Sequence, residues 1–119
     1  MKIFLIFFFL FPTNLFGKYI LHQEIHEAPN NLPCQIEAFV DIGIENIHRF
    51  SLLYRPNGSV EYIETTMNLI GYQKYMGEIP KNFMIGEYIE YYLLLELLYQ
   101  KEVTSPIENA INNPIIIKI

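Results

Sequence analysis

The sequence has a single cysteine, no tryptophan and one aspartate among its 119 residues. With Cys34 alone, no internal disulfide can form, so an apolar core must stabilise the folded chain by itself. Cys34 falls on the apolar side of a predicted strand, which indicates a small buried side chain rather than a reactive thiol. An exposed thiol that pairs with another chain is the alternative.

Basic residues are scarce as well, because eight Lys and Arg face 13 Asp and Glu and leave a net charge of −5. The basic residues form no cluster, and an acidic surface repels phosphate backbones, so we expect no nucleic-acid partner. The six glycines are scattered. No phosphate-binding loop is therefore predicted.

The longest unbroken apolar run near the start of the chain covers residues 3–11, between Lys2 and Pro12. A membrane-spanning helix needs about 20 apolar residues, so the run predicts a signal peptide, residues 1–17, with cleavage after Gly17. We expect an exported protein that is secreted, periplasmic or on the cell surface, with no stable membrane span after cleavage. Retention of the leader as an anchor is the alternative.

Residues 18–119 are expected to form one domain with about seven strands. All nine tyrosines lie in this part of the chain, and tyrosine suits half-buried sheets. Alternating polarity, interrupted by Gly, Pro and Asn, predicts strands at residues 19–27, 34–41, 49–55, 60–65, 72–79, 87–99 and 113–119, with 67–70 as a weak edge strand. Pro29, Asn30, Asn31 and Pro33 are expected to end the first strand or to switch it between sheets. With no helical spacer between strands, the pattern predicts an all-β antiparallel sandwich.

The alternation also predicts which side chains face the core. The expected inward residues are Cys34, Ile36, Ala38 and Val40, then Phe50, Leu52 and Tyr54, then Tyr75, Gly77 and Ile79. Arg49, Ser51 and Arg55 are expected to face outward. Pro56, Asn57 and Gly58 predict a tight reversal into the strand at 60–65.

Residues 87–99 are the ambiguous stretch, because their Leu and Glu content favours a helix. A helix would spread the apolar side chains around its whole circumference. A strand places Ile89, Tyr91, Leu93, Leu95 and Leu97 on one face and Glu90 and Glu96 on the other. The periodicity therefore favours a strand.

Several features follow one another in order through the predicted domain: the stretch 36–41, the run 50–55 followed by Gly58, the pair Ile79 and Pro80, the pair Tyr91 and Tyr92, and Pro106. This order resembles the immunoglobulin-like modules, of fibronectin type III kind, in secreted and cell-surface bacterial proteins. The resemblance implies a spacer, an adhesion module or a protein-binding module without catalytic chemistry. It also implies that Tyr91 stands near the start of the penultimate strand, where related sandwiches tie a tyrosine hydroxyl to the backbone. The missing disulfide and tryptophan depart from the antibody pattern.

Among candidate sites, His22, Glu24 and His26 would share one face of a strand, where they could hold a divalent metal. A solvated polar stripe explains the three side chains more simply, so no metal and no cofactor are expected. Cys34, three serines and three histidines lie in no catalytic motif, and any Glu-rich surface offers pairs of carboxylates. We therefore expect no enzymatic activity.

Binding is the favoured role, to a protein partner that the sequence does not identify. The alternation leaves several tyrosines outside the core, where tyrosine gives amphipathic contact area. The candidates are Tyr62, Tyr72, Tyr88, Tyr92 and Tyr99. Packing on the outer face of a sheet is their other explanation. A small carbohydrate- or metal-binding domain is the alternative function, and an unpaired Ile-rich closing strand, residues 113–119, could support self-association.

Overall fold

The computed structural model describes residues 19–56, 58–107 and 109–119, and the predicted leader lies outside them. The regular secondary structure of the described residues is almost entirely β-strand, as the alternation predicted. Their strands are β1 (Ile20–Leu21), β2 (Cys34–Val40), β3 (Ile47–Pro56), β4 (Ile63–Thr66), β5 (Asn68–Gly71), β6 (Lys74–Ile79), β7 (Tyr88–Leu97), β8 (Glu102–Ser105) and β9 (Ile115–Lys118). Three short 3-10 turns, Ile44–Asn46, Lys81–Phe83 and Leu98–Gln100, lie in connections between strands.

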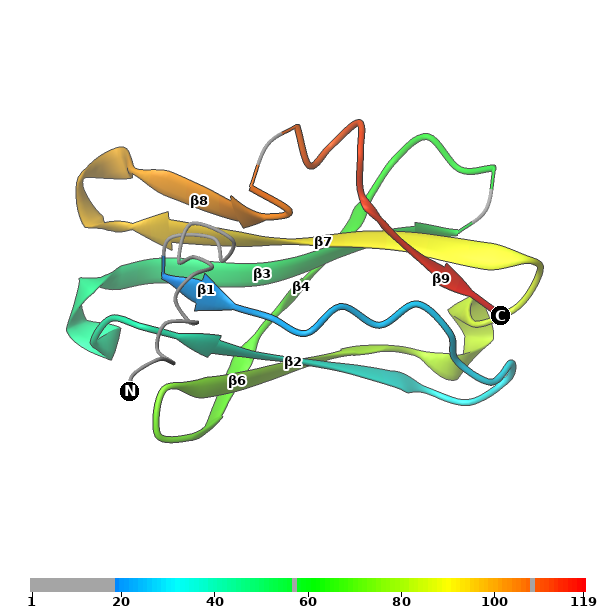
Figure 1. Cartoon of the computed structure of the whole chain (residues 1–119), viewed down its shortest axis with the longest axis horizontal. Coiled ribbons are helices and arrows are strands. Elements are labelled where there is room, and N and C mark those ends of the chain that lie inside the picture. The colour runs from blue at the N-terminus through cyan, green and yellow to red at the C-terminus, as the bar shows by residue number, and fades with distance from the viewer. Residues whose placement is uncertain (1–18, 57, 108) are drawn as a thin grey trace, which may run out of the picture.

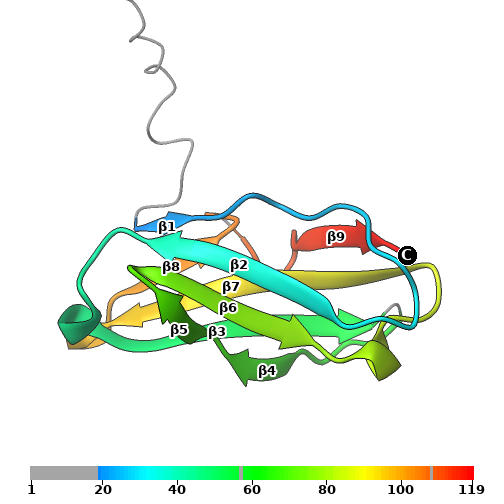
Figure 2. The same ribbon diagram turned by 90° about the horizontal axis from the view of Figure 1, so that it is seen from below.

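The strands form two antiparallel sheets that face each other (Figure 1). One sheet has the order β1-β2-β6-β5, and the other has the order β4-β3-β7-β8. Strand β9 also pairs with β7, at residues 88–91, whereas β8 pairs with residues 93–96. Viewed from below, the two layers are stacked with the long strands nearly along the same direction (Figure 2). This arrangement confirms a β-sandwich.

The strand order is compatible with an immunoglobulin-like fold. In constant-type immunoglobulin domains, strands A, B, E and D form one sheet and C, F and G form the other, and variable types add a strand beside C. Here β1, β2, β6 and β5 take the places of A, B, E and D. The strands β3 and β7 take those of C and F, β4 is the added strand, and β8 and β9 divide the place of G.

The core lies between the sheets and consists of the predicted inward faces. Each predicted inward residue of β2, β3 and β6 is buried. The ambiguous stretch forms a strand, β7, and not a helix. Its buried face carries Ile89, Tyr91, Leu93, Leu95 and Leu97. Gly77 is the one inward position without a side chain, because a Cβ there would lie 2.6 Å from the Sδ atom of Met67. The sheets therefore approach closely at this glycine.

Strand β1 is much shorter than the predicted first strand, residues 19–27. Only Ile20 and Leu21 pair with β2, opposite Val40 and Phe39. The chain then leaves β2 and joins the other sheet at Glu27, which bridges in parallel to Lys118 of β9. The predicted switch between sheets thus occurs, but before Pro29 rather than at the proline-rich turn. We call residues 19–28, which cross from one sheet to the other, the strap.

The described residues form nine strands rather than about seven, because β8 was not predicted and the weak segment at 67–70 is the strand β5. Strand β8 was not predicted, since four residues without a marked apolar alternation give little signal. The closing strand is confirmed as β9, and its outer edge is bonded to the strap at Lys118. The N–H of Lys118 donates to the carbonyl of His26, and the N–H of Ala28 donates to the carbonyl of Lys118. The strap therefore occupies this edge at Lys118, and self-association through the rest of the edge stays a prediction.

Two details of the β3–β4 pair also differ from expectation. The partner strand begins at Ile63 rather than at residue 60, so the reversal after Pro56 is a longer loop and not a tight hairpin. Asn57, part of the predicted turn, lies outside the described residues. Ser51 faces away from the core, yet it is buried, because its hydroxyl donates to the Glu64 carboxylate of β4 at 2.6 Å. Alternation predicts the direction of a side chain, but it does not predict whether side chains of a neighbouring strand bury an outward-facing residue.

The weak segment at 67–70 is confirmed as the edge strand β5.

Candidate functional site

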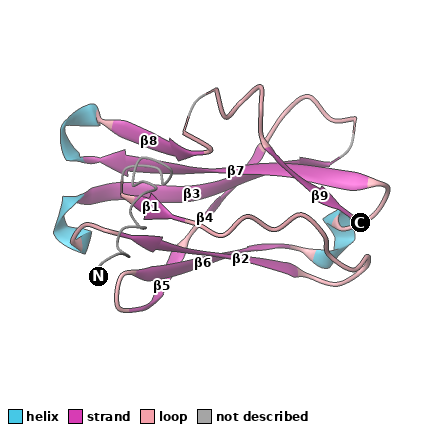
Figure 3. Ribbon diagram, in the orientation of Figure 1, coloured by secondary structure: helices cyan, strands magenta, loops and turns pink. Residues whose placement is uncertain are grey.

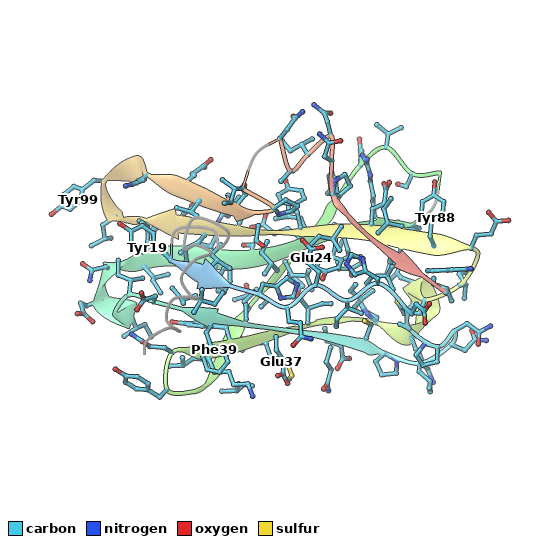
Figure 4. The ribbon with its side chains drawn as sticks, in the orientation of Figure 1. Tyr19, Glu24, Glu37, Phe39, Tyr88 and Tyr99 are labelled. Atoms are coloured by element: carbon cyan, nitrogen blue, oxygen red, sulfur yellow. The ribbon has the colours of Figure 1, made fainter. Side chains whose placement is uncertain are left out.

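The five candidate tyrosines do not form one surface. Tyr72 and Tyr99 are 87% and 96% exposed, whereas Tyr92 is 6% exposed and Tyr62 and Tyr88 are half-buried. Figure 4 shows Tyr88 and Tyr99 near opposite ends of the molecule. The candidates therefore separate into residues that pack on a sheet and residues that stand in turns.

Tyr62 and Tyr92 belong to the packed group. Their rings meet edge to face at 4.9 Å between centroids, and the guanidinium of Arg55 lies 4.4 Å from the centre of the Tyr62 ring. Arg55 also donates to the Glu90 carboxylate at 2.6 Å, and this hydrogen bond raises the pKa of the guanidinium. Burial raises the pKa of the Tyr92 hydroxyl. These contacts explain Tyr62 and Tyr92 by cross-strand packing.

Tyr72 and Tyr99 stand in two turns at one end of the sandwich. The β5–β6 turn carries Tyr72, and the β7–β8 turn carries Leu98 and Tyr99 (Figure 3). The β2–β3 loop lies at the same end and exposes Ile44. Direct contacts link this end: the N–H of Asp41 donates to the carbonyl of Tyr19, and the N–H of Val40 donates to the carbonyl of Gln73. We call Tyr19, residues 41–46, 72–73 and 98–101 the tyrosine end.

The backbone at the tyrosine end is unusual at three places. Tyr19, Gln73 and Tyr99 have φ values of 73°, 55° and 67°, in the left-handed region. Residues other than Gly, Asn and Asp rarely adopt this backbone conformation, because their Cβ atom crowds the carbonyl oxygen. Two large aromatic residues therefore occupy positions where glycine would be less strained.

A hollow of about 550 Å³ lies beside Tyr99. Leu97, Leu98 and Tyr99 form its apolar lining, and His48, Glu96 and Glu102 form its polar lining. Arg49 neutralises part of this charge, since its guanidinium is 2.7 Å from the Glu96 carboxylate. The hollow can receive an apolar side chain, and Glu102 can meet a neighbouring cation.

The opposite end also has exposed apolar residues, but they are aliphatic. Its loops, residues 28–33, 58–62 and 80–87, expose Leu32, Val60 and Ile85. Its left-handed positions hold Asn31, Gly58 and Gly86, the residue types that adopt this conformation most readily. We call these three loops the glycine end.

The metal candidates do not converge. The strap is not a strand at these residues, so His22, Glu24 and His26 no longer share a face. Both ring nitrogens of His22 have protein partners, the carbonyl of Glu37 and the hydroxyl of Tyr91, each at 2.7 Å. His26 lies 3.1 Å from Glu24 in an exposed pair. Within residues 19–56, 58–107 and 109–119, no three His, Cys, Asp or Glu side chains are grouped so that they could hold a metal ion.

The nucleophile candidates lie in different surroundings. Cys34 is buried on the inner face of β2, and burial raises the pKa of its thiol, which disfavours the nucleophilic thiolate. Ser51 donates its hydroxyl to Glu64, a carboxylate that also lies 3.3 Å from Arg49. Neither side chain is paired with a histidine in the described structure.

Sequence reasoning missed several residues of the tyrosine end. Ile44 and Leu98 were not predicted as surface candidates. Ile44 lies between predicted strands, where alternation does not apply, and Leu98 was assigned to the predicted strand at 87–99, which ends at Leu97 in the structure. For Ile44 the signal that could have found it is positional, because a large apolar side chain between two predicted strands has no sheet to face.

In the described part of the chain, no helix is long and apolar enough to cross a membrane. The sequence matches no known protein-family model and no curated protein. The fold and the geometry above are therefore the basis for assigning a role.

Proposed function

We propose that the chain is an exported, non-catalytic immunoglobulin-like module of fibronectin type III kind that binds a protein partner through its tyrosine end. The observation that carries the proposal is Tyr99, which is 96% exposed in a left-handed turn. Backbone strain at an exposed tyrosine has no evident use inside the fold. It is consistent with a side chain retained for an external contact.

The chemistry of the tyrosine end supports a protein rather than another macromolecule as the partner. Tyrosine is enriched in protein interfaces, since its rigid ring buries much surface with little loss of conformational entropy. Leu98 and Ile44 add aliphatic area, and the hollow beside Tyr99 carries Glu96 and Glu102. A partner that presents an apolar side chain next to a lysine or arginine would complement this surface.

Export and the absence of chemistry are parts of the same proposal. Export is supported by the leader pattern at residues 1–17, and mass spectrometry of the chain from its own cells tests it. The expected N-terminus is Lys18. An unprocessed chain that fractionates with cytosolic proteins would contradict this part.

Site-specific photo-crosslinking tests the binding surface. A photoreactive amino acid replaces Tyr72 or Tyr99 in the full chain, expressed in its own cells, and Leu32 or Ile85 in matched controls at the glycine end. We expect the same discrete protein adduct from positions 72 and 99 and no such adduct from positions 32 and 85. Adducts of equal yield from all four positions, or none from any, would overturn the proposal.

A further inference from the structure

The middle of the strap is fastened by one histidine and one tyrosine. His22 Nδ1 lies 2.7 Å from the carbonyl oxygen of Glu37 on β2, and His22 Nε2 lies 2.7 Å from the hydroxyl of Tyr91 on β7. The same hydroxyl oxygen accepts the N–H of Ile25 at 3.1 Å. A single side chain of the strap therefore contacts both sheets of the sandwich.

The chemistry of these partners fixes where the protons lie. A carbonyl oxygen can only accept, so Nδ1 of His22 carries the hydrogen and donates to Glu37. In the neutral ring Nε2 is then an acceptor, so the Tyr91 hydroxyl donates to it. Every hydrogen of the group has an acceptor, and the Tyr91 oxygen still accepts from Ile25.

We propose that His22 makes the strap a proton-dependent closure: the neutral ring fastens the strap to β2 and β7, and protonation of Nε2 releases its middle. A protonated Nε2 becomes a donor, so the Tyr91 hydroxyl hydrogen loses the acceptor that it has in this structure. The charged ring would also lie in a half-buried position. Both effects favour movement of the strap away from the sandwich.

Few charged groups are available to stabilise a protonated His22. Glu24 lies on the strap itself and attracts the charge, but His26 is 3.1 Å from its carboxylate. The Glu37 carboxylate is on the outer face of β2 and lies 3.3 Å from Lys74. From β7 the ring meets Tyr91, whose hydroxyl is held neutral because burial raises its pKa.

The burial of His22 also favours the neutral ring in the closed strap. Burial is the largest influence on His22 and lowers its pKa below 6.5, against smaller opposing effects of the Glu37 carbonyl and Glu24. The closed strap thus favours the neutral ring. Closure is fully effective above the unfolded-state pKa near 6.5, and it weakens as the pH falls below that value, because the open strap binds the proton more readily.

The strap is fixed at both ends, so release of its middle would expose the groove and the β2 edge that lie between those ends. Its ends are held independently, by β1 next to β2 and by the bonds of His26 and Ala28 to β9. Between these ends, a groove of about 670 Å³ runs along the strap and the outer side chains of β2. Glu24 of the strap and Glu37 of β2 both line this groove, and both are labelled in Figure 4. Release would widen the groove and uncover the edge of β2 at residues 35–38, which have no strand partner on that side in the described ladder.

Amide hydrogen exchange on the full chain tests the proposal. Protection factors, corrected for the intrinsic effect of pH, are compared at pH 7.5 and pH 5.0. We expect protection of the Ile25 amide to fall roughly tenfold for each unit by which the pKa of His22 is lowered, while amides of β3 and β7 keep theirs. His22→Gln should abolish this pH dependence, and the matched variants His26→Gln and His48→Gln should retain it.

An Ile25 amide with the same protection at both pH values in the unmodified chain would overturn the proposal. An equal pH effect in His22→Gln would also overturn it. If His22→Gln does not fold, nitrogen chemical shifts of the unmodified chain replace that variant. We expect the hydrogen of His22 on Nδ1 at pH 7.5 and a midpoint below 6.5. A hydrogen on Nε2, or a midpoint at or above 6.5, would contradict the proposal.

Discussion

The two ends of the sandwich both have left-handed backbone in their loops, but different residues occupy those positions. At the glycine end, left-handed backbone falls on Asn31, Gly58 and Gly86. At the tyrosine end it falls on Gln73 and on two tyrosines, Tyr19 and Tyr99. The glycine end follows the backbone preference, whereas the tyrosine end departs from it.

The difference distinguishes turns whose residues suit the backbone conformation from turns whose residues do not. A loop that only reverses the chain is most stable with Gly or Asn at a left-handed position. A large side chain at such a position destabilises the fold. Tyr19 is partly buried against the core, whereas Tyr99 is 96% exposed, so only Tyr99 supports the proposed external contact. Exposure alone would not make this distinction, because both ends expose apolar residues.

The largest expected effect is on binding. The double variant Tyr72→Ser/Tyr99→Ser should lower affinity for the crosslinked partner by about a hundredfold, since interface tyrosines often contribute more than 1 kcal/mol each. Leu32→Ser/Ile85→Ser at the glycine end should leave affinity within about threefold of the original. Titration of the purified partner by calorimetry measures both. Equal losses in the two double variants would remove the distinction between the ends.

Gly86→Val tests the glycine end. Gly86 has a φ of 86° and open space around the place of a Cβ, so the effect isolates backbone strain from crowding. We expect a loss of about 2 kcal/mol in the free energy of unfolding, measured by urea titration. Gly71→Ala is the matched control, because a Cβ there makes ordinary contact with Lys74 at 3.7 Å. A loss in Gly71→Ala as large as that in Gly86→Val would show that left-handed backbone is not the cause.

Tyr91→Phe tests the strap, which connects the two ends. The change removes the acceptor of the Ile25 N–H and the donor to His22, while the buried ring stays. We expect a loss of about 1.5 kcal/mol in the free energy of unfolding at pH 7.5, from one unsatisfied buried donor and one lost hydrogen bond. The loss should become smaller at pH 5, because the same group is already weakened there. An unchanged stability at pH 7.5 would show that the strap is held by β1 and β9 alone.

The sequence predicts the inner layers of this fold well, because alternation reports burial directly. The inward residues of β2, β3, β6 and β7 follow from a period of two, and at β7 that period overrides the helical propensity of its leucines. The same rule fails for the strap. Its residues alternate, yet the chain stops pairing with β2 after Leu21, and His22 instead bonds through its side chain to Glu37 and Tyr91, residues far apart from it in the sequence.

The candidate site is only partly predictable for a related reason. Tyr72 and Tyr99 could be proposed from the sequence, since alternation leaves both outside the core, although they were assigned to the ends of predicted strands and the structure places them in turns. Tyr92 could not be separated from them, because its burial depends on Tyr62 across the sheet. Left-handed backbone at Tyr99 has no local sequence signal, so the strain that supports a binding role appears only in the structure.

The free energy of unfolding of Tyr99→Gly tests the central claim most directly. Relief of the left-handed strain should stabilise the fold by about 1 kcal/mol, measured by urea titration, and Asn31→Gly at the other end should change it by less than about 0.5 kcal/mol. A decrease in stability for Tyr99→Gly would mean that the tyrosine is kept for the fold itself, which contradicts its assignment to an external contact.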